Sequence, residues 1–118
     1  MSRTIRNITI VLAAALAPSL GLAQDSVDKG KALYAQQCVM CHGSGGRGDG
    51  PAAMSLKPKP RDLTGKAYMA GLTDQYLADI VKKGGAGLGK SPLMPSFGAA
   101  LKEADIRNVV VFLRSLEK

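Results

Sequence analysis

Apolar residues recur at helical spacing in three segments of this sequence, and the stretches between them are rich in glycine and proline. The first segment carries apolar or small residues at intervals of three and four from Val27 to Cys38. Asp25 and Ser26 precede it and are suited to cap a helix N-terminus. We therefore expect a first amphipathic helix that ends in the glycine-rich segment after His42.

Two further helices are predicted in the second half of the chain. One is capped by Thr73 and stopped by Gly84-Gly85. The other starts from Lys102, without the usual serine or threonine cap, and Asp105 in its first turn favours the helix dipole. Their apolar faces consist of Tyr76, Leu77, Ile80 and Val81 in one helix, and of Ile106, Val109, Val110, Leu113 and Leu116 in the other.

The segments 43–61 and 84–98 are dense in glycine and proline and are predicted to be long loops. No segment alternates strictly enough between apolar and polar residues to indicate a strand. The sequence therefore predicts an all-α fold of three to four short helices and long loops.

Residues 1–23 have the layout of a secretory signal peptide: two arginines, an apolar stretch and small residues ending at Ala23. A membrane anchor is the alternative, but Pro18 and Gly21 interrupt an apolar run that is already shorter than the roughly 20 residues of a span. We expect cleavage after Ala23, no permanent membrane span, and one mature domain of residues 24–118.

Composition narrows the possibilities further. With 118 residues, of which 46% are hydrophobic and 21% charged, the chain is one small domain and not a disordered tail, a polytopic membrane protein or a multidomain enzyme. It has three tyrosines, two phenylalanines and no tryptophan, so its core is thin. Domains of this size often need a disulfide, metal or cofactor for stability.

The pentapeptide Cys38-Val39-Met40-Cys41-His42 matches C-x-x-C-H, the attachment motif of c-type haem. Two thiols three residues apart lie on one side of a helical turn, where each can form a thioether with a haem vinyl group. The adjacent His42 is then the proximal iron ligand. The motif predicts one covalently attached haem c.

Other uses of these residues are weaker. A thioredoxin-like dithiol is the main chemical rival, but that pair follows a strand, and none is predicted before Cys38. A disulfide would leave His42 without a role, and two cysteines with one histidine cannot supply four zinc ligands.

The second axial ligand is expected to be Met94, because the chain contains no other histidine. Met94 lies between Pro92 and Pro95, which restrict its backbone. Met54 follows His42 too closely, and Met69 is better explained as a core residue that fills a gap.

Together these residues resemble a class I c-type cytochrome, of the short bacterial monohaem type that is similar to the haem domains of cbb3-type oxidase subunits. The resemblance rests on Gly30 and Tyr34 ahead of CVMCH, and on the segments GRGDGPAA, PRDLT, SPLMPSFG and IRNVVVFLRSL. It implies the cytochrome c fold, with helices and loops wrapped around the haem.

The resemblance also implies two contacts. The first and last helices should cross where Gly30 and Tyr34 meet Phe112 or Leu113. The Pro51 carbonyl either accepts a hydrogen bond from the far ring nitrogen of His42 or belongs to a simple loop turn.

Axial ligation by histidine and methionine leaves no site for substrate and predicts a non-enzymatic carrier of one electron. The export signal places this carrier in the periplasm, between a donor and an acceptor redox protein. Alternatives are a haem subunit of a larger dehydrogenase or oxidase, and a ligand-binding or catalytic haem protein. The net charge of +7 includes a basic cluster at Lys57, Lys59, Arg61 and Lys66, which is either ordinary solvated surface or a face that steers an acidic partner. Nucleic acid is not an expected partner.

Overall fold

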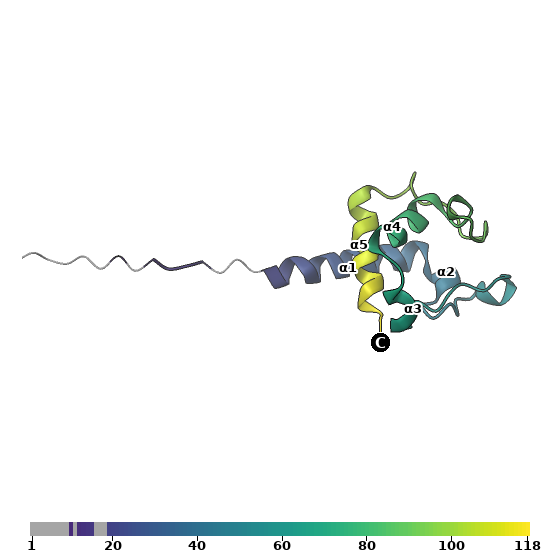
Figure 1. Cartoon of the computed structure of the whole chain (residues 1–118), viewed down its shortest axis with the longest axis horizontal. Helices are drawn as coiled ribbons and strands as arrows, with labels where there is room; N and C mark the ends of the chain where they lie inside the picture. Colours follow the sequence, from purple (N-terminus) through teal and green to yellow (C-terminus); the bar gives the residue numbers. More distant parts are fainter. Residues whose placement is uncertain (1–9, 11, 16–18) are drawn as a thin grey trace, which may run out of the picture.

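The computed structural model describes residues 10, 12–15 and 19–118. In this part the regular structure is helical and contains no strand, which confirms the all-α prediction (Figure 1). The α-helices are α1 (Ser19–Gln37), α2 (Val39–His42), α3 (Lys66–Ala70), α4 (Asp74–Lys83) and α5 (Glu103–Ser115), with 3-10 turns η1 (Ala53–Ser55) and η2 (Ala86–Leu88).

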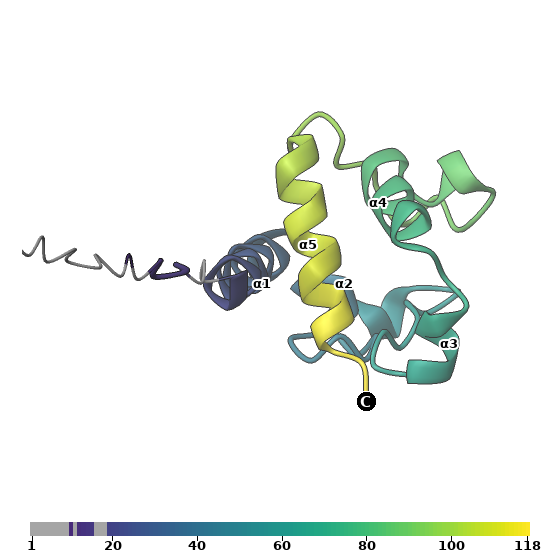
Figure 2. The same ribbon diagram turned by 60° about the vertical axis from the view of Figure 1, so that its left-hand side comes forward.

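Helices α1 and α5 cross at close range (Figure 2). A β-carbon on Gly30 would overlap the backbone carbonyl of Asn108, so only glycine lets the two helices approach this closely. One turn later, the rings of Tyr34 and Phe112 pack at a centroid distance of 5.1 Å. The expected contact between the first and last helices is confirmed.

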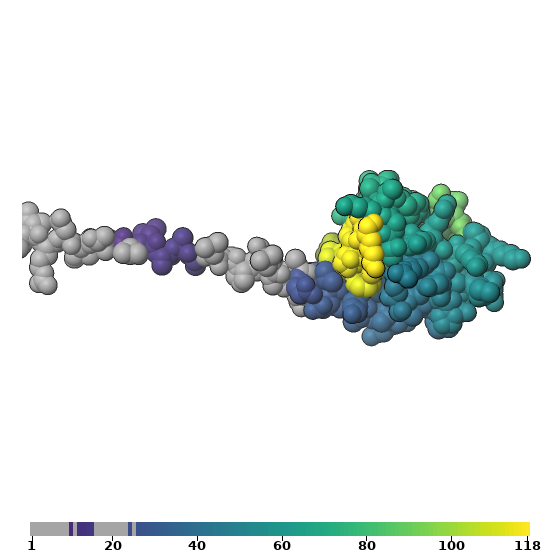
Figure 3. All heavy atoms as spheres, turned by 90° about the horizontal axis from the view of Figure 1, so that it is seen from below, coloured from purple at the N-terminus to yellow at the C-terminus, as the bar shows by residue number. Residues whose placement is uncertain are grey.

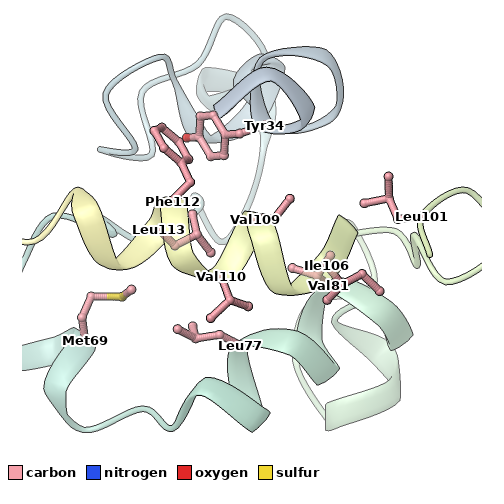
Figure 4. Close-up of a cluster of buried hydrophobic side chains, with 10 residues drawn as sticks. All are labelled: Tyr34, Met69, Leu77, Val81, Leu101, Ile106, Val109, Val110, Phe112 and Leu113. Atoms are coloured by element: carbon pink, nitrogen blue, oxygen red, sulfur yellow. The ribbon is translucent and has the colours of Figure 1, made fainter. Parts of the chain in front are cut away.

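The other side of α5 packs on α4. Figure 4 shows the resulting core, in which α5 lies between Tyr34 on one side and side chains of α3 and α4 on the other. The buried cluster consists of Tyr34, Met69, Leu77, Val81, Leu101, Ile106, Val109, Val110, Phe112 and Leu113. Figure 3 shows the end of α5 between α1 and the segment that contains α3 and α4.

The caps of the two later helices follow local chemistry. The Thr73 hydroxyl accepts a hydrogen bond from the Tyr76 amide at 3.0 Å, and α4 stops at Gly84, whose φ is +75°. At the start of α5, Lys102 offers no side-chain acceptor to the first-turn amides, but the Asp105 carboxylate accepts from the Lys102 amide at 3.1 Å, which is one half of a capping box. These predicted boundaries are confirmed.

The first helix differs from the prediction. It begins at Ser19, ahead of the expected cap at Asp25 and Ser26, because alanine and leucine in this stretch propagate a helix well. It also breaks at Cys38, so that α2 is a separate turn. The short helix α3 was not predicted, since five residues are too few to establish a hydrophobic period.

Much of the predicted signal peptide, residues 1–23, lies outside the described residues, and its cleavage is not tested. Over the described part of the chain, no helix combines the length and the apolar character that crossing a membrane requires.

Candidate functional site

The C-x-x-C-H motif occupies the break after α1 and the single turn α2. The backbone is helical there: the amides of Cys41 and His42 donate to the Cys38 carbonyl at 3.2 and 2.9 Å. Both cysteines are half-buried and form no disulfide with each other. The two thiols and the imidazole therefore come from one helical turn, as the spacing predicts.

Burial, and secondarily the nearby Cys41, raises the pKa of the Cys38 thiol to about 11. Dithiol oxidoreductases need the opposite, a thiolate stabilised at neutral pH by positive charge or a helix N-terminus. The surroundings of Cys38 therefore do not favour thioredoxin-like chemistry.

The His42 ring is half-buried, and burial lowers its pKa. Its Nδ1 atom is fully buried and has no hydrogen-bond partner among the described residues. The expected bond from the ring to the Pro51 carbonyl is therefore not formed. Pro51 instead occupies a turn closed by the Ala53 amide and the Gly50 carbonyl at 2.9 Å.

The donor set of this turn is the one that a haem attached through sulfur requires: two free, half-buried thiols three residues apart, followed directly by a half-buried imidazole. The residues of this turn therefore fit a covalently bound haem c.

The glycine-rich loop after the motif is bonded to the carbonyls that α2 leaves exposed. Amides of the loop donate to consecutive carbonyls of the motif: Ala52 to Met40 at 2.9 Å, Gly50 to Cys41 at 3.1 Å and Gly48 to His42 at 2.8 Å. A β-carbon on Gly50 would overlap the carbonyl of Met40, so the close approach needs glycine there. The loop thereby fixes the helical turn that presents the thiols.

Tyr34 fixes the same loop from the side of the core. Its hydroxyl donates a buried hydrogen bond of 2.6 Å to the carbonyl of Gly43, the residue directly after the motif. Gly43 has a φ of +79°, which favours glycine. Burial is the main reason that the pKa of Tyr34 is raised.

Met94 lies in the loop between η2 and α5, far from the motif in sequence. Its side chain is half-buried and packs against the same hydrophobic core as Cys38. Met69 is fully buried in that core, as expected of a gap-filling residue, whereas Met40 and Met54 are 61% and 79% exposed. The surroundings of Met94 are consistent with the predicted axial role, and its coordination of iron stays a prediction.

The predicted basic residues Lys57, Lys59, Arg61 and Lys66 are all exposed. The Arg61 guanidinium lies 5.3 Å from the centroid of the Tyr68 ring, a cation–π contact that sequence reasoning missed. Arg61 lies in the loop before α3 and Tyr68 lies on α3, so no helical spacing indicates the pair.

The family model described as "Cytochrome C oxidase, cbb3-type, subunit III" matches residues 25–113. Two curated relatives are each 28% identical: the cbb3-type cytochrome c oxidase subunit FixP of Bradyrhizobium diazoefficiens over 88 residues, and subunit CcoP of Azospirillum brasilense over 91 residues. The matches cover 75% and 77% of this chain. They cover 27% and 28% of the relatives, so the chain spans less than a third of their length.

A solved structure gives the fold independently. The reducing HAO-like protein complex of Kuenenia stuttgartiensis superposes with a TM-score of 0.66 at 24% identity, over 98% of this chain and 52% of the other. The superposition agrees with the cytochrome c fold. The family match over most of the chain establishes a class I cytochrome c domain, an electron-transfer unit whose cofactor is covalently bound haem c. The chain belongs to the family of cbb3-type cytochrome c oxidase subunit III.

Proposed function

We propose that this chain is exported to the periplasm and carries single electrons on one haem c between two redox proteins. The observation that carries the proposal is the turn Cys38–His42, where two free, half-buried thiols and the half-buried imidazole of His42 come from one helical turn. The basic and apolar layout of residues 1–23 supports export.

In this proposal each residue has one role. Cys38 and Cys41 would hold haem c through two thioethers, and His42 and Met94 would be the protein ligands of its iron. When bound, haem c supplies an iron couple that changes by one electron between the ferric and ferrous states. Two protein ligands leave no open position for substrate, and a thioether favours the ferrous state, which raises the reduction potential.

The surroundings of the site serve the same end. The core side chains beside Cys38 and Met94 are apolar and keep water away from that side of the site. The glycine-rich loop holds the motif in place through backbone hydrogen bonds to its carbonyls. A rigid, apolar environment limits the reorganisation that accompanies a change of oxidation state.

The donor and acceptor are proposed to meet the chain through the exposed basic cluster Lys57, Lys59, Arg61 and Lys66. Positive charge of this kind steers an acidic partner and is screened by salt. The rate of electron exchange with an acidic redox partner should therefore fall as ionic strength rises. A rate that is independent of salt would remove the electrostatic part of the proposal.

A second candidate is a haem subunit that remains docked in a larger complex. It is favoured by the relatives, which are described as oxidase subunits and are much longer than this chain. Purification from membranes and from the periplasm distinguishes the two. A free carrier appears alone in the periplasmic fraction, whereas a subunit appears with a catalytic chain.

The decisive experiment combines three measurements on the native protein. The mass should equal residues 24–118 plus one haem, and a pyridine haemochrome spectrum should report two thioether bonds. Carbon monoxide should not bind the reduced protein at neutral pH but should bind after Met94→Ala. A colourless chain with free thiols would overturn the proposal, and ready binding by the unmodified protein would favour a ligand-binding haem.

A further inference from the structure

The loop that carries Met94 is attached to the C-terminal end of α4 by hydrogen bonds at the methionine and just after it. The Gly85 amide donates to the Met94 carbonyl at 3.0 Å. The amides of Phe97 and Gly98 donate to the carbonyls of Val81 and Lys82, each at 3.0 Å. The last carbonyls of a helix lack partners within the helix, and here the loop supplies them.

One side chain takes part in this attachment. The Ser96 hydroxyl donates to the Lys82 carbonyl, which also accepts from the Gly98 amide. Ser96 lies two residues after Met94, and Pro95 between them restricts the backbone. The position of the methionine is thereby coupled to the end of α4.

The approach of the loop to α4 is very close. Gly84 has a φ of +75°, and a β-carbon there would lie 2.8 Å from the Ser96 amide nitrogen and 2.9 Å from the Met94 carbonyl oxygen. The neighbouring Gly85 is more crowded, because its β-carbon would lie 1.8 Å from the carbonyl oxygen of Ser91. Two glycines at the helix end thus allow the Met94 segment to lie directly against it.

From this geometry we propose that Ser96 is a positioning residue, whose hydroxyl fastens the Met94 loop to α4 and keeps the thioether in place as an iron ligand. The inference rests on the proposed role of Met94. A thioether is a weak ligand, so its occupancy depends on how firmly the protein holds it against competing ligands. The Ser96 hydroxyl adds one side-chain hydrogen bond to the backbone bonds, and a single substitution can remove it.

The test is competition at the iron by added imidazole, followed by visible absorption of the ferric haem-loaded protein. Ser96→Ala should raise the apparent affinity for imidazole about twofold to tenfold, the range expected for one hydrogen bond. Ser96→Thr keeps a hydroxyl and should restore the value of the unmodified protein.

Ser115→Ala is the matched control. Ser115 also donates its hydroxyl to a helix carbonyl, that of Phe112, but it lies on α5 outside the Met94 loop. We expect Ser96→Ala and Ser115→Ala to lower the thermal midpoint to a similar extent. Only Ser96→Ala should change the affinity for imidazole. Equal effects of the two variants on imidazole binding would overturn the positioning role and leave only general stability.

Met94→Ala separates the two proposals. If it opens the iron to imidazole while Ser96→Ala has no effect, the role of Ser96 is wrong and the ligand assignment stands. If Met94→Ala leaves imidazole binding unchanged, Met94 is not the ligand, and the inference about Ser96 is overturned with it.

Discussion

The guanidinium of Arg114 on α5 donates a 2.8 Å hydrogen bond to the carbonyl of Met69, the last turn of α3. The same side chain also donates to the Leu72 carbonyl at 2.6 Å and to the carboxylates of Asp74 and Glu117 at 2.8 and 2.9 Å. One arginine thus joins α5 to the connection between α3 and α4.

Replacing this arginine should be costly even when the charge is kept. Arg114→Lys loses the planar fork and cannot reach all four acceptors, so we expect the free energy of unfolding to fall by about 2 kcal/mol. Urea denaturation of the haem-loaded protein measures it. Arg107→Lys, on the same helix and exposed, is the control and should change little. A similar decrease in the free energy of unfolding in both variants would contradict the role of the Arg114 guanidinium.

Tyr34→Phe removes the hydroxyl that binds the Gly43 carbonyl and leaves the ring stacked on Phe112. The Gly43 carbonyl keeps only the weaker bond from the Gly46 amide at 3.1 Å, so we expect a loss of about 0.5–1.5 kcal/mol in urea denaturation. Tyr76→Phe is the comparison, because the described structure gives the Tyr76 hydroxyl no hydrogen bond. If the two variants are equally stable, the bond to the loop contributes nothing.

Gly30→Ala tests the crossing of α1 and α5. The added methyl would overlap the Asn108 carbonyl, so the helices must separate, and overpacking of this kind costs about 1–3 kcal/mol. The thermal midpoint of the haem-loaded protein should fall accordingly. Gly45→Ala, where a β-carbon meets no neighbouring atom, should leave it nearly unchanged. A tolerated Gly30→Ala would mean that the crossing is looser than described.

Asp62 predicts a dependence on pH. Its carboxylate accepts from the Thr64 amide at 2.9 Å and the Thr64 hydroxyl at 2.7 Å, and these bonds, with a smaller contribution from Arg47, lower its pKa. A lowered pKa means stability that is present above the pKa of the unfolded chain and lost as pH falls through that of the folded protein.

Asp62→Asn imitates the protonated carboxyl. The unmodified protein should therefore have the higher thermal midpoint at pH 7, and the difference should vanish in acid as the carboxyl takes up its proton. Thermal unfolding between pH 7 and pH 2.5 checks this. A difference that persists unchanged at the lowest pH would show that the carboxylate charge is not the cause.

The sequence predicted well wherever the determinants are local. Thr73 and Gly84 bound α4 through contacts with their own neighbours, and the periodic valines and leucines of α5 define its buried face. The C-x-x-C-H spacing likewise needs only one helical turn. Met94 came from elimination and from flanking prolines, and its coordination of iron stays a prediction.

The parts that failed depend on residues distant in sequence. No sequence pattern indicates that the Ser96 hydroxyl bonds to the Lys82 carbonyl at the end of α4. Nor does any pattern indicate that Arg114 donates to the Met69 carbonyl on α3. For Pro51 the sequence left two alternatives, a bond to His42 or a loop turn, and the structure shows the turn. Such contacts arise only once the helices have packed.

The ladder between carbonyls 40–42 and amides 48–52 also fixes the length of the intervening chain. Three consecutive carbonyls pair there with amides that are spaced two residues apart. One residue inserted between 43 and 47 would shift this pairing and would move a side chain into the place of Gly50, where a β-carbon does not fit. Insertions are better accommodated in the largely exposed stretch 54–59. Homologues should therefore vary in length in that outer stretch and keep a constant spacing next to the cysteines.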